Sequence, residues 1–209
     1  MGCFRSGKRW PKRRIPFSMT PNARRLGGNN ILSAIKQWND NTNIQLVDMA
    51  EWVKGGGRVN ASQIRFALSA TARRCNSSVG KQGGIQKIRC RTNWPVWVVV
   101  HEIGHLLGLY HEQQRMDRDK FVVIDPIMLG RAEYTRNFSK KRPPYSISVG
   151  RYDLVSIMHY GSMPGLRMKL PPGRITLATF GPRRRSLGMR KTTWLSKGDV
   201  AAINKMYKK

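Results

Sequence analysis

Acidic residues are scarce in this 209-residue chain. The sequence contains only 11 Asp and Glu residues but 39 Lys and Arg residues, so the formal net charge is +28. Such a surface attracts polyanions generally, whether nucleic acid, acidic polysaccharide, anionic membrane or acidic protein. No aromatic residues alternate with the basic ones in the pattern that stacks bases. We therefore expect contacts with acidic protein or another polyanion through the basic surface, and no dedicated nucleic-acid site. The basic clusters are Arg13–Arg14, Arg73–Arg74, Lys140–Arg142 and Arg183–Arg185.

Long apolar runs are also lacking. No stretch of about 18 apolar residues is present, so the sequence contains no candidate transmembrane segment. Residues 1–14 lack the apolar core of a signal peptide. Met1-Gly2-Cys3 begins a loose match to a myristoylation pattern. A mature or truncated start is the preferred interpretation, because so short a pattern often arises by accident.

Cysteine is rare as well. The three cysteines, Cys3, Cys75 and Cys90, match no zinc-ribbon spacing. Cys75 and Cys90 could form one disulfide, which would close a loop of about sixteen residues and stabilise the fold by about 3 kcal/mol. The alternative is two free thiols. A bridge would indicate an oxidising compartment.

Apolar periodicity predicts a mixture of helices and strands in one domain. The sequence shows no linker and no internal repeat, and the roughly seventy residues after Gly108 have little periodicity. We expect an N-terminal subdomain over about 9–108 and a C-terminal subdomain over about 109–209. Helices are predicted from Asn29 or Asn30 to about Asn39, from about Pro95 to Leu107, and after Ser196, where Asp199 completes a capping-box-like pattern. Strands are predicted at 44–47, 62–69, 77–79 and 85–88.

Three of the four histidines fall within eleven residues, in the segment His101-Glu102-Ile103-Gly104-His105-Leu106-Leu107-Gly108-Leu109-Tyr110-His111. Helix positions four apart lie only about 40° apart around the axis, so His101 and His105 can hold one cation. Gly108 permits a sharp exit from the helix, because only glycine enters positive φ without steric cost. That turn would bring His111 round as a third ligand.

This pattern predicts a catalytic rather than a structural metal site. Three imidazole ligands leave the fourth position of a zinc ion open for water. The metal lowers the pKa of that water, and Glu102 can accept its proton and later pass it to the leaving amine. A lone His-Glu-x-x-His pattern is about as often a pair of surface histidines that bind no metal as it is a metal site. The glycine and the third histidine make the full pattern far more restrictive.

A second motif, Ser156-Ile157-Met158-His159-Tyr160, matches the methionine turn of the metzincin proteases. With both motifs present, the chain resembles the astacin-family metallopeptidases over nearly its whole length. Further segments that resemble this family are Arg9-Trp10-Pro11, Ile15-Pro16, Cys75–Gly80, Glu112–Asp119 and Ile203–Tyr207.

The resemblance implies an α+β metzincin-like fold. Its twisted, mostly parallel sheet and two helices lie above an irregular C-terminal subdomain that ends in a helix. The resemblance favours the Cys75–Cys90 disulfide and secretion. It also implies a second disulfide that this chain lacks, because Asn43 and the Lys208–Lys209 tail occupy the places of its two cysteines.

The resemblance also implies roles for individual residues. His101, His105 and His111 would bind one Zn²⁺ per chain, and Glu102 would act as general base and acid. Tyr160 would stabilise the negative charge of the oxyanion with its hydroxyl. Two further residues have implied roles, namely Met158 in the supporting turn and Glu112 as the buried partner of the processed amino terminus.

The leading hypothesis is a secreted, monomeric zinc endopeptidase that cuts extended polypeptides. The alternative is a catalytically weak or inactive cationic module that binds polyanions and keeps a structural zinc site. Glu102 and Tyr160 argue against the alternative, because a site without chemistry needs neither of them.

Overall fold

The computed structural model describes residues 2–68, 72, 75–91, 95–125, 132–160, 166–170, 174–176 and 194–208. The basic clusters Arg73–Arg74 and Arg183–Arg185 lie outside these residues. The chain divides into two compact units. We call Lys8–Leu109 with Ile203–Lys209 the sheet unit, and Met1–Gly7 with Tyr110–Ala202 the loop unit.

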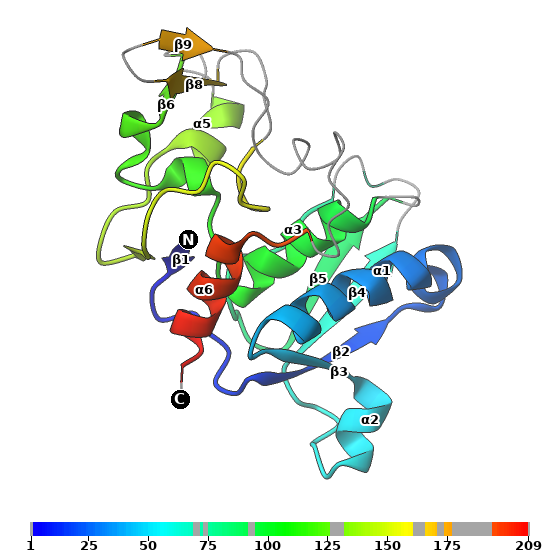
Figure 1. Cartoon of the computed structure of the whole chain (residues 1–209). Coiled ribbons are helices and arrows are strands. Elements are labelled where there is room, and N and C mark those ends of the chain that lie inside the picture. The colour runs from blue at the N-terminus through cyan, green and yellow to red at the C-terminus, as the bar shows by residue number, and fades with distance from the viewer. Residues whose placement is uncertain are drawn as a thin grey trace. The chain divides into compact units, whose positions relative to one another are not determined.

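The sheet unit is built on four strands in the order β3-β2-β4-β5 (Figure 1). All three neighbouring pairs are parallel. The predicted parallel sheet and the α+β class are therefore confirmed. The strands are β2 (Arg14–Met19), β3 (Gln45–Asp48), β4 (Gln63–Leu68) and β5 (Ile85–Cys90).

Two long helices, α1 (Pro21–Asn41) and α3 (Val96–Leu107), pack against each other in the sheet unit (Figure 1). The buried indole of Trp38 joins them, because its Nε1–H donates to Val100 O at 3.1 Å. The predicted start of the first helix at Asn29 or Asn30 is wrong. The helix begins at Pro21, after Thr20 accepts a capping hydrogen bond from the backbone N–H of Ala23.

The predicted strand at 77–79 is also wrong, whereas the predicted disulfide is confirmed. Only Asn76 forms an isolated bridge there, with Arg89, and the disulfide joins Cys75 to Cys90. Cys3 is a buried free thiol. A short helix that the sequence did not predict, α2 (Met49–Lys54), follows β3.

Asn43 stands in the place of one cysteine of the second disulfide that the family resemblance implies, and it forms hydrogen bonds there. Its backbone N–H donates to Asn204 Oδ1 at 2.8 Å, and its side-chain amide donates to Tyr207 O at 3.0 Å. Asn204 belongs to the predicted terminal helix, α6 (Lys197–Met206). The two segments that a disulfide would connect are therefore held by hydrogen bonds.

The loop unit consists of short elements around a small apolar core of Val122, Phe138, Tyr152 and Leu166. Strand β1 (Cys3–Arg5) pairs antiparallel with β7 (Ser146–Ser148). A second antiparallel sheet contains β6 (Val122–Ile124), β8 (Leu166–Leu170) and β9 (Arg174–Thr176). Helix α5 (Ala132–Phe138) and 3-10 turns at Glu112–Gln114 and Arg118–Lys120 complete the described part. None of the helices described here is long and apolar enough to cross a membrane.

Candidate active site

Helix α3 ends where the sequence predicts, at Gly108. This glycine has a φ of 111°, and the backbone N–H of Leu109, which follows it, donates to Gly104 O at 2.9 Å. A side chain at Gly108 would be strained by this φ, and its Cβ would lie 2.4 Å from Met206 Cε. The sharp exit of the chain after His105 therefore requires glycine.

The structure brings the three predicted histidines together. His101, His105 and His111 each offer one ring nitrogen, and these nitrogens all lie within 4.8 Å of one another. The rings of His101 and His105 meet edge to face, with centroids 4.6 Å apart. Among the described residues, no other group of three or more His, Cys, Asp or Glu residues has this spacing. A zinc ion with bonds of about 2.0–2.1 Å to nitrogen fits such a cluster.

The surroundings of His105 determine which of its two ring nitrogens is available to coordinate a metal. Nδ1 lies 2.8 Å from the carbonyl oxygen of Leu109. Since a carbonyl can only accept, Nδ1 must carry the proton. Burial, and then the nearby His101, lower the pKa of His105 to about 3. The ring is therefore neutral, and Nε2 keeps the lone pair that a metal requires.

Glu102 lies on the same helix and is 6% exposed. Ser77 Oγ lies 2.7 Å from Glu102 Oε2 and 3.0 Å from the backbone oxygen of the same residue. This contact limits the rotation of the Glu102 side chain. Ser77 had no predicted role, because it precedes Glu102 by 25 residues and no spacing pattern connects them.

Met158 lies in a tight turn, as the second motif predicts. The backbone N–H of His159 closes the turn on Ser156 O at 3.1 Å, and Met158 N–H donates to Ser156 Oγ at 3.0 Å. Met158 O in turn accepts from the backbone N–H of Glu112 at 3.0 Å. The turn is thereby connected to the residue that follows His111.

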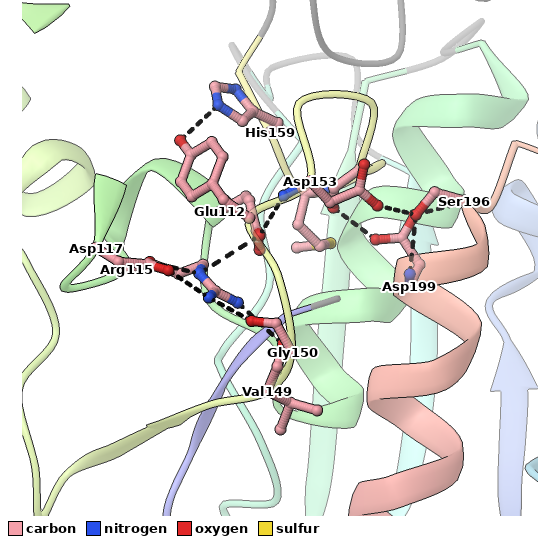
Figure 2. Close-up of polar contacts among 12 residues, drawn as sticks. Glu112, Arg115, Asp117, Val149, Gly150, Asp153, His159, Ser196 and Asp199 are labelled. Carbon is pink, nitrogen blue, oxygen red and sulfur yellow. Dashed lines mark hydrogen bonds and ion pairs between the residues drawn. The ribbon is translucent and has the colours of Figure 1, made fainter. Parts of the chain in front are cut away.

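A buried carboxylate that the sequence did not single out as part of the site supports this turn. Asp199 accepts from Ser156 Oγ at 2.5 Å and from the backbone N–H of Ile157 at 2.9 Å. It also accepts from the backbone N–H of Ser196 at 2.8 Å, which is the reciprocal bond of the predicted capping box (Figure 2). Burial raises the pKa of Asp199, although these hydrogen bonds oppose the shift. One side chain therefore caps α6 and fixes the methionine turn.

We expect Asp199→Ala to lower the free energy of unfolding by about 3 kcal/mol, because it leaves several buried donors without an acceptor. Urea denaturation measures this loss. Asp40→Ala is the matched control, since the Asp40 side chain is half exposed and its one ion pair among the described residues is with Lys36. Its effect should stay below about 0.5 kcal/mol. Equal losses in the two variants would contradict the assigned role of Asp199.

Glu112 is completely buried beside Arg115 (Figure 2). Its Oε1 accepts from the backbone N–H of Asp153 at 2.9 Å and lies 3.6 Å from Arg115 Nε. Oε2 has no hydrogen-bond partner among the described residues. Burial raises the pKa of Glu112 well above its usual value, while Arg115 acts in the opposite direction. Met1 lies outside the described residues, so the expected contact with the amino terminus stays a prediction.

Arg115 organises the chain that follows the third histidine. It is 2% exposed. Its Nε and Nη2 donate to the two carboxylate oxygens of Asp117, both at 2.8 Å. The guanidinium also donates to Val149 O at 3.0 Å and to Gly150 O at 2.7 Å. This fork joins the turn after His111 to a segment more than thirty residues later.

Tyr160 lies next to His111, with ring centroids 4.5 Å apart. Its backbone N–H donates to Gln113 Oε1 at 3.1 Å, and its ring meets Phe138 edge to face at 5.7 Å. The tyrosine and the third histidine are therefore held by neighbouring parts of the same unit.

The fourth histidine, His159, is engaged elsewhere. Its Nδ1 lies 2.7 Å from Tyr160 O, so this nitrogen carries a proton. Burial lowers the pKa of His159 to about 4. The ring is neutral at pH 7, and Nε2 accepts a hydrogen bond from the Tyr152 hydroxyl at 2.7 Å. Both nitrogens thus have partners outside the cluster of three histidines.

Comparison with known proteins identifies relatives along the whole chain. Residues 3–208 match the Astacin family of peptidases. Tolloid-like protein 1 of Homo sapiens is 33% identical over 213 residues, which cover 98% of this chain and 19% of that protein. Zinc metalloproteinase nas-7 of Caenorhabditis elegans is 26% identical, with 99% of this chain and 50% of that protein covered. The chain thus spans about a fifth to a half of these relatives.

Solved structures show the same fold. High choriolytic enzyme 1, a hatching enzyme zinc-protease from Oryzias latipes, matches with a TM-score of 0.66 and 24% identity over 99% of this chain and 98% of that one. Myroilysin matches with a TM-score of 0.66 and 18% identity over 100% of this chain and 99% of that one. The chain therefore shares the fold of these two proteins.

Proposed function

Because this chain belongs to the astacin family of peptidases, we propose that it is a zinc endopeptidase that hydrolyses peptide bonds within extended polypeptides. The cofactor of this family is zinc. The observation that carries the proposal is the convergence of three histidine nitrogens within 4.8 Å of one another, on a segment that also contains the buried Glu102. This is the donor set of a catalytic zinc site with one open position.

His101, His105 and His111 are the proposed zinc ligands. When bound there, zinc lowers the pKa of a coordinated water and polarises the scissile carbonyl. The neutral state of His105 supports this assignment, because its Nδ1–H is held by Leu109 O and its Nε2 is left to coordinate.

Glu102 is the proposed general base and acid. Its carboxylate takes the proton from the attacking water and then delivers that proton to the amine of the departing peptide. The contact with Ser77 Oγ supports this role, because it holds one carboxylate oxygen in place while the other can accept the proton. Tyr160 is the proposed donor that stabilises the negative charge on the carbonyl oxygen. Its place beside the His111 ring supports that role.

We also propose that the protein is secreted and acts as a monomer on polypeptide substrates. The Cys75–Cys90 disulfide supports secretion, since such bonds persist in oxidising compartments. The net charge of +28 supports additional contacts with acidic proteins or other polyanions.

A simple assay distinguishes a zinc endopeptidase from a protein that only binds polyanions. We expect the purified protein to contain one zinc ion per chain and to degrade an unstructured protein such as reduced casein. The chelator 1,10-phenanthroline should abolish this activity, and added zinc should restore it. The non-chelating isomer 1,7-phenanthroline is the control. Binding of polyanions with no hydrolysis in any of these conditions would favour the alternative.

A further inference from the structure

Two adjoining cavities in the sheet unit have no part in the proposed catalysis. One has a volume of about 380 Å³ and the other about 210 Å³. They share three lining residues, Lys12, Arg14 and Trp52. We call the two cavities together the basic groove. Its other lining residues are Trp10, Pro11, Arg13, Pro16, Gly55–Gly57, Ala61, Ser62 and Lys81.

The cations of the basic groove are not neutralised by described residues. Lys12 and Arg14 are exposed, and neither they nor Arg13 and Lys81 form an ion pair within the part of the chain that the structure describes. The acidic residues of the sheet unit lie elsewhere. Asp40 and Asp48 are paired with Lys36 and Arg24, Glu102 is buried, and Glu51 lines neither cavity. The groove therefore presents uncompensated positive charge to any ligand.

The indole of Trp52 forms a fixed flat surface at the centre of the groove. Its Nε1–H donates to Arg58 O at 3.3 Å. The loop 55–57 passes directly against the ring, because a Cβ built on Gly57 would lie only 2.1 Å from Trp52 Nε1. Trp52 is only partly buried and lines both cavities. A planar apolar surface beside unpaired cations fits a ligand that carries both rings and anionic groups.

Three observations favour an acidic polysaccharide over other polyanions. The strand residues in the groove, Arg14 and Pro16, lie where β2 pairs with β3 alone, because its pairing with β4 begins at Phe17. This edge is only three residues long and contains a proline, which has no backbone N–H to donate, so it offers an extended peptide little to pair with. Trp52 is the only partly exposed aromatic residue that lines the groove, since Trp10 is 3% exposed, whereas nucleic-acid grooves stack successive bases on several rings. The disulfide, finally, is typical of proteins that meet sulfated and carboxylated glycans outside the cell.

We infer that the basic groove binds a sulfated or carboxylated polysaccharide, with the anionic groups on Lys12 and Arg14 and a sugar ring on Trp52. The choice of a polysaccharide rests on the proposed secretion, whereas binding in the groove does not depend on hydrolysis. Such a site would hold the enzyme on an acidic matrix without occupying the active site.

Binding of a heparin-derived octasaccharide to the full chain, measured by calorimetry, tests the inference. We expect Lys12→Gln/Arg14→Gln to weaken binding about tenfold, since two charge contacts of somewhat less than 1 kcal/mol each are lost. Trp52→Ala should weaken binding about tenfold and Trp52→Phe about twofold, because phenylalanine keeps an aromatic face. The matched control is Arg25→Gln/Lys87→Gln, which removes the same charge from exposed positions outside the groove. Its effect should not exceed about twofold.

Hydrolysis of a short uncharged peptide should be equal in all these variants, which shows that they are folded. An equal loss of octasaccharide binding in the control would overturn the inference in favour of diffuse surface charge. Tighter binding of single-stranded DNA of matched charge, dependent on Lys12 and Arg14, would overturn it in favour of nucleic acid. Octasaccharide binding in the groove by a protein without hydrolytic activity would refute the proposed function alone.

Discussion

Glu102→Gln is expected to lower kcat by about three to four orders of magnitude while one zinc ion stays bound per chain. The amide has nearly the shape of the carboxylate, but it cannot accept a proton at neutral pH. Glu102 is 6% exposed and points one oxygen at Ser77 Oγ, and the amide oxygen of glutamine can take the same hydrogen bond. The loss should therefore be chemical rather than structural.

Three measurements separate these effects. The turnover of an unstructured protein substrate reports the chemistry, the zinc content of the dialysed protein reports the ligands, and urea denaturation reports the fold. Glu51→Gln is the matched control, because Glu51 lies exposed on α2 in the same unit. It should leave all three values within about twofold of the original. Turnover in Glu102→Gln within tenfold of the original protein would refute the assigned base.

The cluster of three histidines could be predicted because its geometry is local. The spacing of His101 and His105 is fixed by the helical repeat, and the exit that precedes His111 is fixed by one glycine with positive φ. No distant contact is needed to place these residues on one segment. The same reasoning explains the correct predictions for β4, β5 and α3, whose apolar patterns are uninterrupted.

The residues that support the site could not be predicted, because they are distant in sequence. Ser77 reaches Glu102 across 25 residues, and Asp199 reaches Ser156 across 43. Asp199 was expected only to cap a helix, which is a local role. Its second role depends on the fold as a whole, and no spacing pattern reports it.

The wrong boundary of α1 has a different cause. The predicted start at Asn29 or Asn30 left out Gly27 and Gly28, which are poor helix formers. In the structure, α1 packs so closely on β4 that a Cβ at Gly27 would lie 2.8 Å from Leu68 Cδ1. Glycine at this position lets α1 approach β4 closely, and this tertiary packing outweighs the low helix propensity of the residue.

His111→Ala is expected to reduce zinc affinity by at least about a thousandfold and to reduce hydrolysis to the same extent or more. His111 is the only member of the cluster outside α3, so its loss leaves His101 and His105 as a helical pair alone. Two imidazoles hold zinc too weakly to survive dialysis against a competing chelator. Zinc titration with a fluorescent chelator measures the affinity, and turnover at saturating zinc shows whether activity returns when the remaining site is filled.

His159→Gln is the control that makes this result specific, because it removes the one histidine outside the cluster. The pKa of His159 is lowered to about 4, and its two nitrogens are held by Tyr160 O and the Tyr152 hydroxyl. Its replacement should weaken the loop unit but leave zinc affinity within about threefold of the original. If His111→Ala instead retained zinc as tightly as His159→Gln, the third ligand would have to come from another residue. The position of Glu102 relative to the metal would then differ from the one proposed. The assignment of Glu102 as the base would therefore be refuted together with that of His111 as a ligand.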